Sequence, residues 1–203
     1  MAKQERAEQT RQRLIEAASA TFAEHGYAGT SLHQIVRSAG VTMGALTFHF
    51  ASKSALADAV QEAGTAATRE VLHSAGHAPG LQGVLDEVLA LADALRNTHS
   101  IRAAARLTRE GHAADHDWYD SWAPDLREAL ERAWSEEHLD GGLTPLAATS
   151  LLSHVLLGVE ATAASPDSLR TATGDGPEEG LTHALKALGT LIAPSAGSPR
   201  GED

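Results

Sequence analysis

The sequence predicts an all-α fold of about nine helices, and three observations lead to that prediction. Alanine and leucine are the most frequent of the 203 residues, aromatic residues account for only 4% of them, and runs of β-branched residues are missing. Apolar side chains recur three and four residues apart in most segments, as they do on one face of a helix. Glycine, asparagine and proline fall between these segments, where helices are expected to end.

Composition also restricts the setting of the protein. The sequence has no cysteine, so it offers neither disulfides nor thiolate metal sites. The N-terminal residues lack the pattern of a signal peptide, and no uninterrupted apolar run has the length of a membrane span. We therefore expect a soluble cytoplasmic protein that has no membrane partner.

Charge is distributed unevenly along the chain. The formal net charge is -11, yet residues 1–60 hold six Lys and Arg against five acidic residues, so the acidic excess lies in residues 61–203. Two parts of such different charge suggest different partners. An acidic C-terminal part would repel phosphates and orient a near-neutral N-terminal part toward them.

The first two helices can be placed from their apolar spacing and their ends. A first helix is predicted over residues 4–24, and Gly26 suits the left-handed position that follows a helix. A short second helix is predicted over residues 32–38. Ser31 and Gln34 match a capping box, in which the serine hydroxyl accepts a backbone N–H and the glutamine reaches back.

A tight turn and a second short helix come next. Gly40 lies in the turn, and Thr42 caps a helix that ends near Phe50. Ser52 then caps a long fourth helix that runs to about residue 75. Two short helices joined by a glycine-containing turn form a helix-turn-helix. An ordinary helical hairpin within an all-α protein is the alternative interpretation.

The remainder of the chain is expected to be helical as well. Residues 165–179 are expected to form a mobile loop, and residues 194–203 a disordered tail rich in Gly, Ser and Pro. Five helices are predicted there, over residues 81–97, 100–111, 115–137, 143–164 and 179–193.

Residues 30–56, TSLHQIVRSAGVTMGALTFHFASKSAL, strongly resemble the DNA-binding domain of TetR-family transcription regulators. The family pattern has a T-[ST] start, then A-G-V, then a recognition helix G-x-[LI]-Y-x-[HY]-F followed by a lysine. The GAL and FHF segments are most similar to the γ-butyrolactone receptor branch. The resemblance implies a three-helix, helix-turn-helix DNA-binding domain over residues 1–52. It also implies a helical ligand-sensing and dimerisation domain over residues 53–193.

The recognition helix departs from that branch at two positions. The branch usually reads K-G-A-L-Y-F-H-F where this sequence reads MGALTFHF, so Met43 replaces a lysine and Thr47 replaces a tyrosine. The loss of one cation should reduce the salt dependence of DNA binding by about one counterion. Met43 could instead contact a thymine methyl group, and Thr47 can still donate to a phosphate.

One face of the recognition helix is expected to read DNA while Leu46 and Phe50 pack inward. By resemblance, His49 and Lys53 contact phosphates and Ser31 lends its backbone N–H, while Phe48 could belong to the core instead. The residues expected to contact DNA are Ser31, His33, Thr42, Met43, Gly44, Ala45, Thr47, Phe48, His49 and Lys53.

A homodimer on a pseudo-palindromic double-stranded operator is expected, because a single DNA-binding domain with so little positive charge would bind weakly. The resemblance implies a four-helix dimer interface, and the last two long helices carry broad apolar stripes. An internal core is the alternative. The residues assigned to dimerisation are Leu152, Val155, Leu156, Val159, Leu185 and Leu188.

Aromatic residues cluster at Trp118, Tyr119, Trp122 and Trp134, all expected on the helix over 115–137. Packing of an amphipathic helix into the core is one interpretation. By resemblance, a tryptophan lines an apolar pocket for a small effector, for which a lactone with an acyl tail is a candidate. Trp122 is the best match, with Trp118 and Leu126 beside it.

Together these features predict a repressor that a small apolar ligand, with a γ-butyrolactone-type signal as the candidate, releases from its operator. The alternatives are a ligand-independent or differently induced regulator of the same family, for example of an efflux or antibiotic gene, and a helical enzyme. Neither a catalytic constellation nor a phosphate loop is found. The His112-x3-His116 spacing lacks a third ligand, so we expect no enzymatic activity, no cofactor and no metal.

Overall fold

The computed structural model describes residues 2–76, 78–112, 117–137 and 143–163, together with 182, 183, 185–187 and 190. These residues are helical with short connections and contain no strand, which confirms the all-α prediction. The elements are α1 Ala2–His25, α2 Leu32–Ala39, α3 Met43–His49, α4 Lys53–Ala75, α5 Gly80–Asn97, α6 His99–Arg109, the 3-10 helix η1 Trp118–Ser121, α7 Ala123–Glu137 and α8 Pro145–Ala163.

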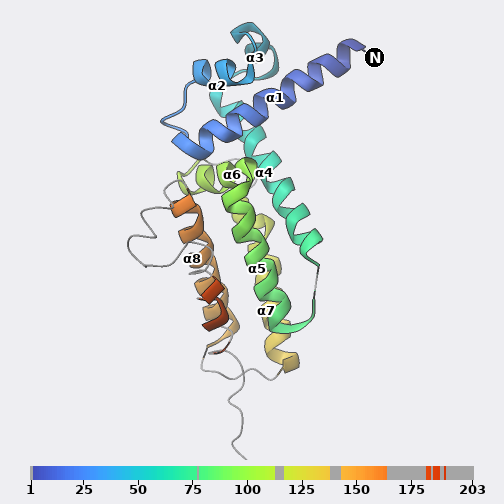
Figure 1. Ribbon diagram of the computed structural model, residues 1–203, viewed down its shortest axis with the longest axis vertical. Coiled ribbons are helices and arrows are strands. Elements are labelled where there is room, and N and C mark those ends of the chain that lie inside the picture. The colour runs from blue at the N-terminus through green and yellow to red at the C-terminus, as the bar shows by residue number, and fades with distance from the viewer. Residues whose placement is uncertain are drawn as a thin grey trace, which may run out of the picture.

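The molecule is elongated, with α1, α2 and α3 at one end and α5, α7 and α8 running lengthwise at the other (Figure 1). Helix α4 connects the two ends, and α6 lies between them beneath α1. We call α1–α3 with α4 up to Ala63 the head, and the rest of α4 with α5–α8 the body.

The short helices of the head begin and end where the sequence predicts. The Ser31 hydroxyl accepts a hydrogen bond from the Gln34 backbone N–H at 3.3 Å, and the Gln34 side chain accepts from the Ser31 N–H at 2.7 Å. Gly40 has a φ of 64° and ends α2 in the left-handed conformation that glycine adopts without strain. The Thr42 hydroxyl accepts from Ala45 N–H at 3.2 Å and starts α3.

The head core is built mainly from α1 and α4, but α6 of the body also contributes to it. Because Ala103 and Leu107 of α6 are completely buried there, the head does not bury its apolar surface alone. The buried members are Leu14, Ile15, Ala17, Ala18, Phe22, Ala23, Ile35, Leu46, Phe50, Leu56, Ala57, Ala59, Val60, Ala103 and Leu107.

The body core joins α5 to α6, α7 and α8 around the two largest buried side chains, Trp118 and Trp122. The structure differs here from the predicted single helix over 115–137. The 3-10 helix ends at Ser121, and α7 begins at Ala123. Pro124 explains the break, because proline has no N–H to donate and is tolerated only in the first turn of a helix.

The other predicted segments of the C-terminal part are only partly covered. The loop over 165–179 and the tail over 194–203 lie outside the described residues, and so does Leu188. Of the helix predicted over 179–193, the described residues 182, 183, 185–187 and 190 are helical.

Helix α8 is long and apolar enough to cross a membrane by length and composition alone, although polar residues, among them His154 and Glu160, interrupt its apolar sequence. Core helices pass the same test. Here Ala148, Leu152 and Leu156 pack into the body core, and Glu160 is buried beside Arg109 of α6. These contacts are those of a helix packed against protein.

Candidate functional site

Helix α3 presents an apolar and uncharged face at the end of the head. Phe48 is 80% exposed, whereas Leu46 and Phe50 are buried in the head core. Phe48 therefore lies on the surface and does not belong to the head core. Its ring lies edge-on to His49, with ring centroids 5.0 Å apart. Thr42, Gly44 and Thr47 are exposed beside it, while Met43, Ala45 and His49 are half-buried.

Helices α2 and α3 carry no negative charge of their own. Between Glu24 and Asp58 the sequence contains no acidic residue, although the whole chain has a net charge of -11. Arg37 and His33 of α2 are exposed on this part of the head. A region without carboxylates that carries exposed cationic and histidine side chains can approach a polyanion without repulsion.

Lys53 does not extend freely into solvent. Its ammonium donates to the carbonyl oxygens of Tyr27 at 2.8 Å and Thr30 at 2.9 Å, and lies 4.2 Å from the centroid of the Tyr27 ring. An ammonium has three N–H donors, and these three neighbours can engage all of them. In this arrangement Lys53 holds the connection between α1 and α2 against the start of α4.

The Ser31 backbone N–H, expected to bind a phosphate, is likewise engaged by the Gln34 side chain at 2.7 Å. Contacts of either group with a phosphate therefore require an existing hydrogen bond to be exchanged. The assignments of Ser31 and Lys53 to DNA contacts stay predictions.

A polar network joins the head to α6, and none of it was found from the sequence. Arg106 donates to the carbonyl oxygens of Ala23 and Glu24 at 3.1 and 2.9 Å, and so caps the C-terminal end of α1. The same guanidinium bonds to Glu110 at 2.8 Å, and Glu110 accepts from the Tyr27 N–H at 2.7 Å. The connection before α2 is thus held from two sides, by α4 and by α6.

His112 completes this junction. Its ring stacks on Tyr27 with centroids 4.7 Å apart, and its Nε2 lies 3.1 Å from Asp58. Gln61 of α4 donates to the His112 carbonyl oxygen at 3.2 Å. His116, its partner in the spacing noted above, lies outside the described residues, and the described residues show no group of three metal-ligating side chains.

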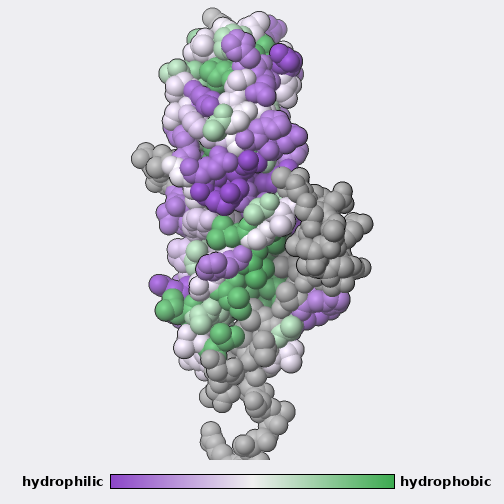
Figure 2. Space-filling model, turned by 90° about the vertical axis from the view of Figure 1, so that its left-hand side faces the viewer, coloured by the Kyte–Doolittle hydropathy of each residue, from purple (hydrophilic) through white to green (hydrophobic). Residues whose placement is uncertain are grey.

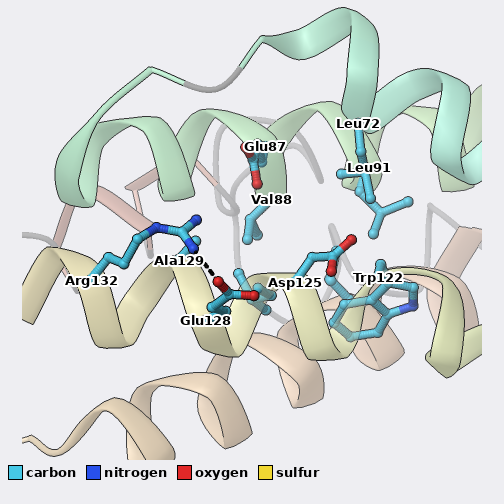
Figure 3. Close-up of a pocket in the computed structure, with 11 residues that line it drawn as sticks. Leu72, Glu87, Val88, Leu91, Trp122, Asp125, Glu128, Ala129 and Arg132 are labelled. Carbon is cyan, nitrogen blue, oxygen red and sulfur yellow. Dashed lines mark hydrogen bonds and ion pairs between the residues drawn. The ribbon is translucent and has the colours of Figure 1, made fainter.

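A cavity of about 290 Å³ opens between α5 and α7 in the body. The close-up shows Leu72, Leu91 and Trp122 at one end and Arg132 with Glu128 at the other (Figure 3). The apolar lining is completed by Val88, Leu126, Ala129 and Leu156, and the polar lining by Glu87 and Asp125. An apolar interior with a few polar groups is typical of small-molecule sites.

The two central tryptophans play different parts. Trp122 is 2% exposed and lines the cavity, and its indole N–H has no hydrogen-bond acceptor within the described part of the chain. Trp118 packs against it with ring centroids 5.3 Å apart but lies outside the cavity lining. Its N–H donates to Thr68 at 3.0 Å. Of the predicted ligand residues, the structure places Trp122 and Leu126 at the cavity and Trp118 in the core.

An ion pair joins α6 to α8 in the body, near the aromatic residues. Arg109 of α6 donates to Glu160 of α8 at 2.6 Å, and Glu160 is buried. The hydrogen bond to Glu160 raises the pKa of Arg109 above its usual value. Burial lowers the pKa of Arg102 and raises that of Tyr119. Each shift follows from the stabilisation or desolvation of the charged form.

The residues assigned to dimerisation mostly face the interior of one chain. Leu152, Leu156, Val159 and Leu185 are buried in the body core, and Val155 is half-buried. Because α8 is apolar around most of its circumference, its sequence does not reveal which side packs inward. The exposed side instead carries Leu146, Ser150, Leu151, His154, Gly158 and Ala161.

This exposed side of α8 is apolar for its position on the surface. Leu146 is 71% exposed and Leu151 is 42% exposed. Viewed from the side on which α8 lies, the body shows a hydrophobic area below a largely hydrophilic belt (Figure 2). Large exposed apolar side chains gathered on one helix face are typical of a protein interface.

Comparison with known proteins supports this arrangement of head and body. Residues 14–60 match the family of bacterial regulatory proteins described as the tetR family. The chain is 32% identical over 162 residues to the A-factor receptor protein of Streptomyces griseus, a match that covers 79% of this chain and 57% of that protein. The chain thus spans less than two thirds of the length of this curated relative.

Solved structures are similar over most of their length. A γ-butyrolactone receptor described as ArpA-like superimposes with a TM-score of 0.66 at 26% identity, covering 92% of this chain and 97% of the other. The TetR regulator TylP from Streptomyces fradiae is 31% identical with a TM-score of 0.57, covering 95% of this chain and 82% of TylP. The chain therefore belongs to the TetR family of bacterial regulatory proteins.

Proposed function

We propose that this protein is a dimeric DNA-binding repressor that a small, mainly apolar effector releases from its operator. The observation that carries the proposal is the connection of the α3 surface to the α5–α7 cavity through α4. This helix supplies Leu72 to the cavity lining, and its Lys53 holds the connection that precedes α2 and α3. As a cytoplasmic DNA-binding protein it would associate with the nucleoid.

Helix α4 also touches the aromatic cluster and α6. Thr68 accepts the Trp118 N–H, and the backbone at Gly64 lies so close to α6 that an added Cβ would overlap the Ser100 carbonyl oxygen and the Ala104 Cβ. A ligand beside Trp122 therefore lies against elements that are packed directly on α4. A preference of about 1.4 kcal/mol for the non-binding arrangement weakens operator affinity tenfold.

The effector class follows from the cavity and from the relatives. Two of the relatives are described as receptors for A-factor and for γ-butyrolactones. The apolar wall around Leu91 and Trp122 suits an acyl chain, and the polar lining around Arg132 at the other end of the cavity suits the polar group of a ligand. We propose a lactone with an acyl tail as the first candidate.

The first experiment selects duplexes from random DNA with the purified protein and then adds a synthetic alkanoyl-γ-butyrolactone to the best complex. A pseudo-palindromic site released by the lactone is the expected result. A site that no lactone releases would overturn the effector class while retaining DNA binding. Failure to enrich any duplex at low salt would overturn the proposed function.

A matched pair of variants tests the cavity. Trp122→Phe shortens the aromatic wall of the cavity and should weaken release by the lactone. Trp134→Phe serves as the control, because Trp134 lies outside the cavity lining. Equal lactone sensitivity of the two variants would exclude a ligand contact by the Trp122 ring.

The dimer is proposed to form through the exposed side of α8. Leu151→Glu should convert a dimer into a monomer in sedimentation analysis, because it places a charge in the apolar contact. Ser135→Glu, on the exposed side of α7, provides the control for added charge. A Leu151→Glu protein that remains dimeric would place the interface elsewhere.

A further inference from the structure

We propose that Phe48 reads the 5-methyl group of thymine in the major groove, so that each operator half-site presents a thymine to the exposed ring. This inference rests on the proposed function and specifies the DNA chemistry that the α3 surface recognises. It names a specificity-determining residue in a helix that lacks the usual hydrogen-bonding readers.

Helix α3 has no side chain that forms a bidentate pair with a purine. Arg and Lys read guanine and Asn and Gln read adenine, but residues 43–49 contain none of these types and no carboxylate. The two threonine hydroxyl groups of this region are engaged locally. Thr42 accepts from the Ala45 N–H, and Thr47 donates to the Gly44 carbonyl oxygen at 3.2 Å.

His49 is the remaining polar side chain of α3, and its position is unsuited to reading bases. It is half-buried, and its ring lies between those of Phe48 and Phe50, with centroids 5.0 and 6.4 Å away. Base discrimination by α3 therefore rests mainly on shape and apolar contact.

Phe48 supplies the apolar contact. It is the most exposed large hydrophobic side chain among the described residues, at 80%. Gly44, one turn earlier, is exposed and has no side chain, and an added Cβ would meet only the Thr42 hydroxyl oxygen at 3.9 Å, so the helix can approach the groove closely. The thymine methyl group is the apolar feature that base edges offer in the major groove.

The charge of α2 and α3 favours DNA as the occupant of this surface. No acidic residue lies between Glu24 and Asp58, and Arg37 is exposed on the neighbouring helix. An apolar protein surface would not require such freedom from carboxylates, whereas a phosphate backbone does. The exposed ring is thus set in surroundings that accept a polyanion.

The test uses the selected operator with single thymines replaced by deoxyuridine, which keeps base pairing and the O4 acceptor but lacks the methyl group. Loss of one buried methyl contact should weaken binding about fourfold. Substitution of equivalent positions in both half-sites should weaken it about 15-fold, because the two contacts add. The sensitive positions should be confined to one or two per half-site.

Two variants assign the effect to its side chain. Phe48→Ala should bind the thymine and deoxyuridine operators equally, and its thermal stability should be unchanged because the ring is exposed. Thr47→Ala is the matched control on the same face and should keep the thymine preference.

The outcomes separate this inference from the proposed function. An operator that is bound equally well with thymine and with deoxyuridine would overturn methyl recognition and leave DNA binding intact. A thymine preference that persists in Phe48→Ala would overturn the assignment to Phe48. If no duplex is enriched at all, the proposed function fails and the inference fails with it.

Discussion

The α3 surface and the α5–α7 cavity are built from the chain in opposite ways. The surface comes from seven consecutive residues, Met43 to His49, placed by caps and a turn within a few residues of them. The cavity is lined from four helices, with Leu72 on α4, Leu91 on α5, Trp122 before α7 and Leu156 on α8. A surface made locally can change its specificity by single substitutions, whereas a cavity made by four helices changes with the packing of the whole body.

The largest effect should come from a substitution in the head core, to which the head and α6 of the body both contribute. Phe22→Ala opens a cavity in the head core and should lower the free energy of unfolding by about 3–5 kcal/mol. The three tryptophans all lie in the body, so tryptophan fluorescence reports the body and circular dichroism the whole chain. Because Ala103 and Leu107 belong to the head core, both signals should shift together. A fluorescence transition that stays in place would mean that head and body unfold independently.

A smaller effect is expected at the contact between α4 and the aromatic cluster. Thr68→Val keeps the side-chain shape but leaves the buried Trp118 N–H without its acceptor. The free energy of unfolding in urea should fall by about 1–3 kcal/mol, which is the usual cost of an unpaired buried donor. Exposed Thr47→Val is the control. An unchanged urea midpoint for Thr68→Val would show that Trp118 finds another acceptor.

Lys53→Met tests whether the head uses this lysine for phosphate binding or for positioning. If the ammonium holds Tyr27 and Thr30, operator affinity should fall about tenfold, or about 1.4 kcal/mol, while the slope of log affinity against log salt stays unchanged. Affinity for unrelated DNA should change little, because the phosphate contacts remain. Binding is measured well below the melting temperature, where the variant is fully folded.

Lys53→Arg separates the two roles further. Arginine keeps the positive charge, but its planar fork cannot reproduce the ammonium contacts with two carbonyl oxygens and a ring. The Lys53→Arg protein should therefore lose as much operator affinity as the Lys53→Met protein. A slope reduced by about one counterion in Lys53→Met, together with full affinity in Lys53→Arg, would establish a phosphate contact instead.

The smallest effect is expected at the cap that starts α4. Ser52→Ala removes the acceptor of the Ala55 N–H at 3.0 Å and should cost about 1 kcal/mol in chemical denaturation. Ser52→Asp should retain most of the stability, because aspartate also caps a helix. A similar loss in both variants would show that the hydroxyl acts through another contact.

The head could be predicted closely because its structure is specified by local interactions. Ser31, Gly40 and Thr42 each fix a helix end with partners no more than four residues away. The same positions carry the family pattern, so fold and family were both accessible from one segment. What remained hidden there were contacts from distant residues, such as the Glu110 carboxylate on the Tyr27 N–H.

The body could not be predicted to the same depth, and particular residues show why. Pro124 breaks the expected helix between Trp118 and Trp134, although the apolar spacing continues across the break. Leu152 and Leu156 face inward while Leu146 and Leu151 face outward, and only tertiary packing decides between these sides of an apolar helix. The prediction of Trp122 for the ligand region came from the family resemblance, and that of Leu126 from its helical spacing after Trp122.

The close approach of α4 and α6 at Gly64 has a mechanical consequence. No side chain separates the two backbones there, so if a rigid α4 tilts about this contact, its two ends move in opposite directions. Leu72 lies about 12 Å from Gly64 along the helix axis, and Lys53 lies about 16 Å away on the other side. A rigid α4 that tilts at Gly64 therefore moves further at its Lys53 end than at its Leu72 end. A displacement of about 1 Å at the cavity end becomes about 1.4 Å in the opposite direction beneath the head.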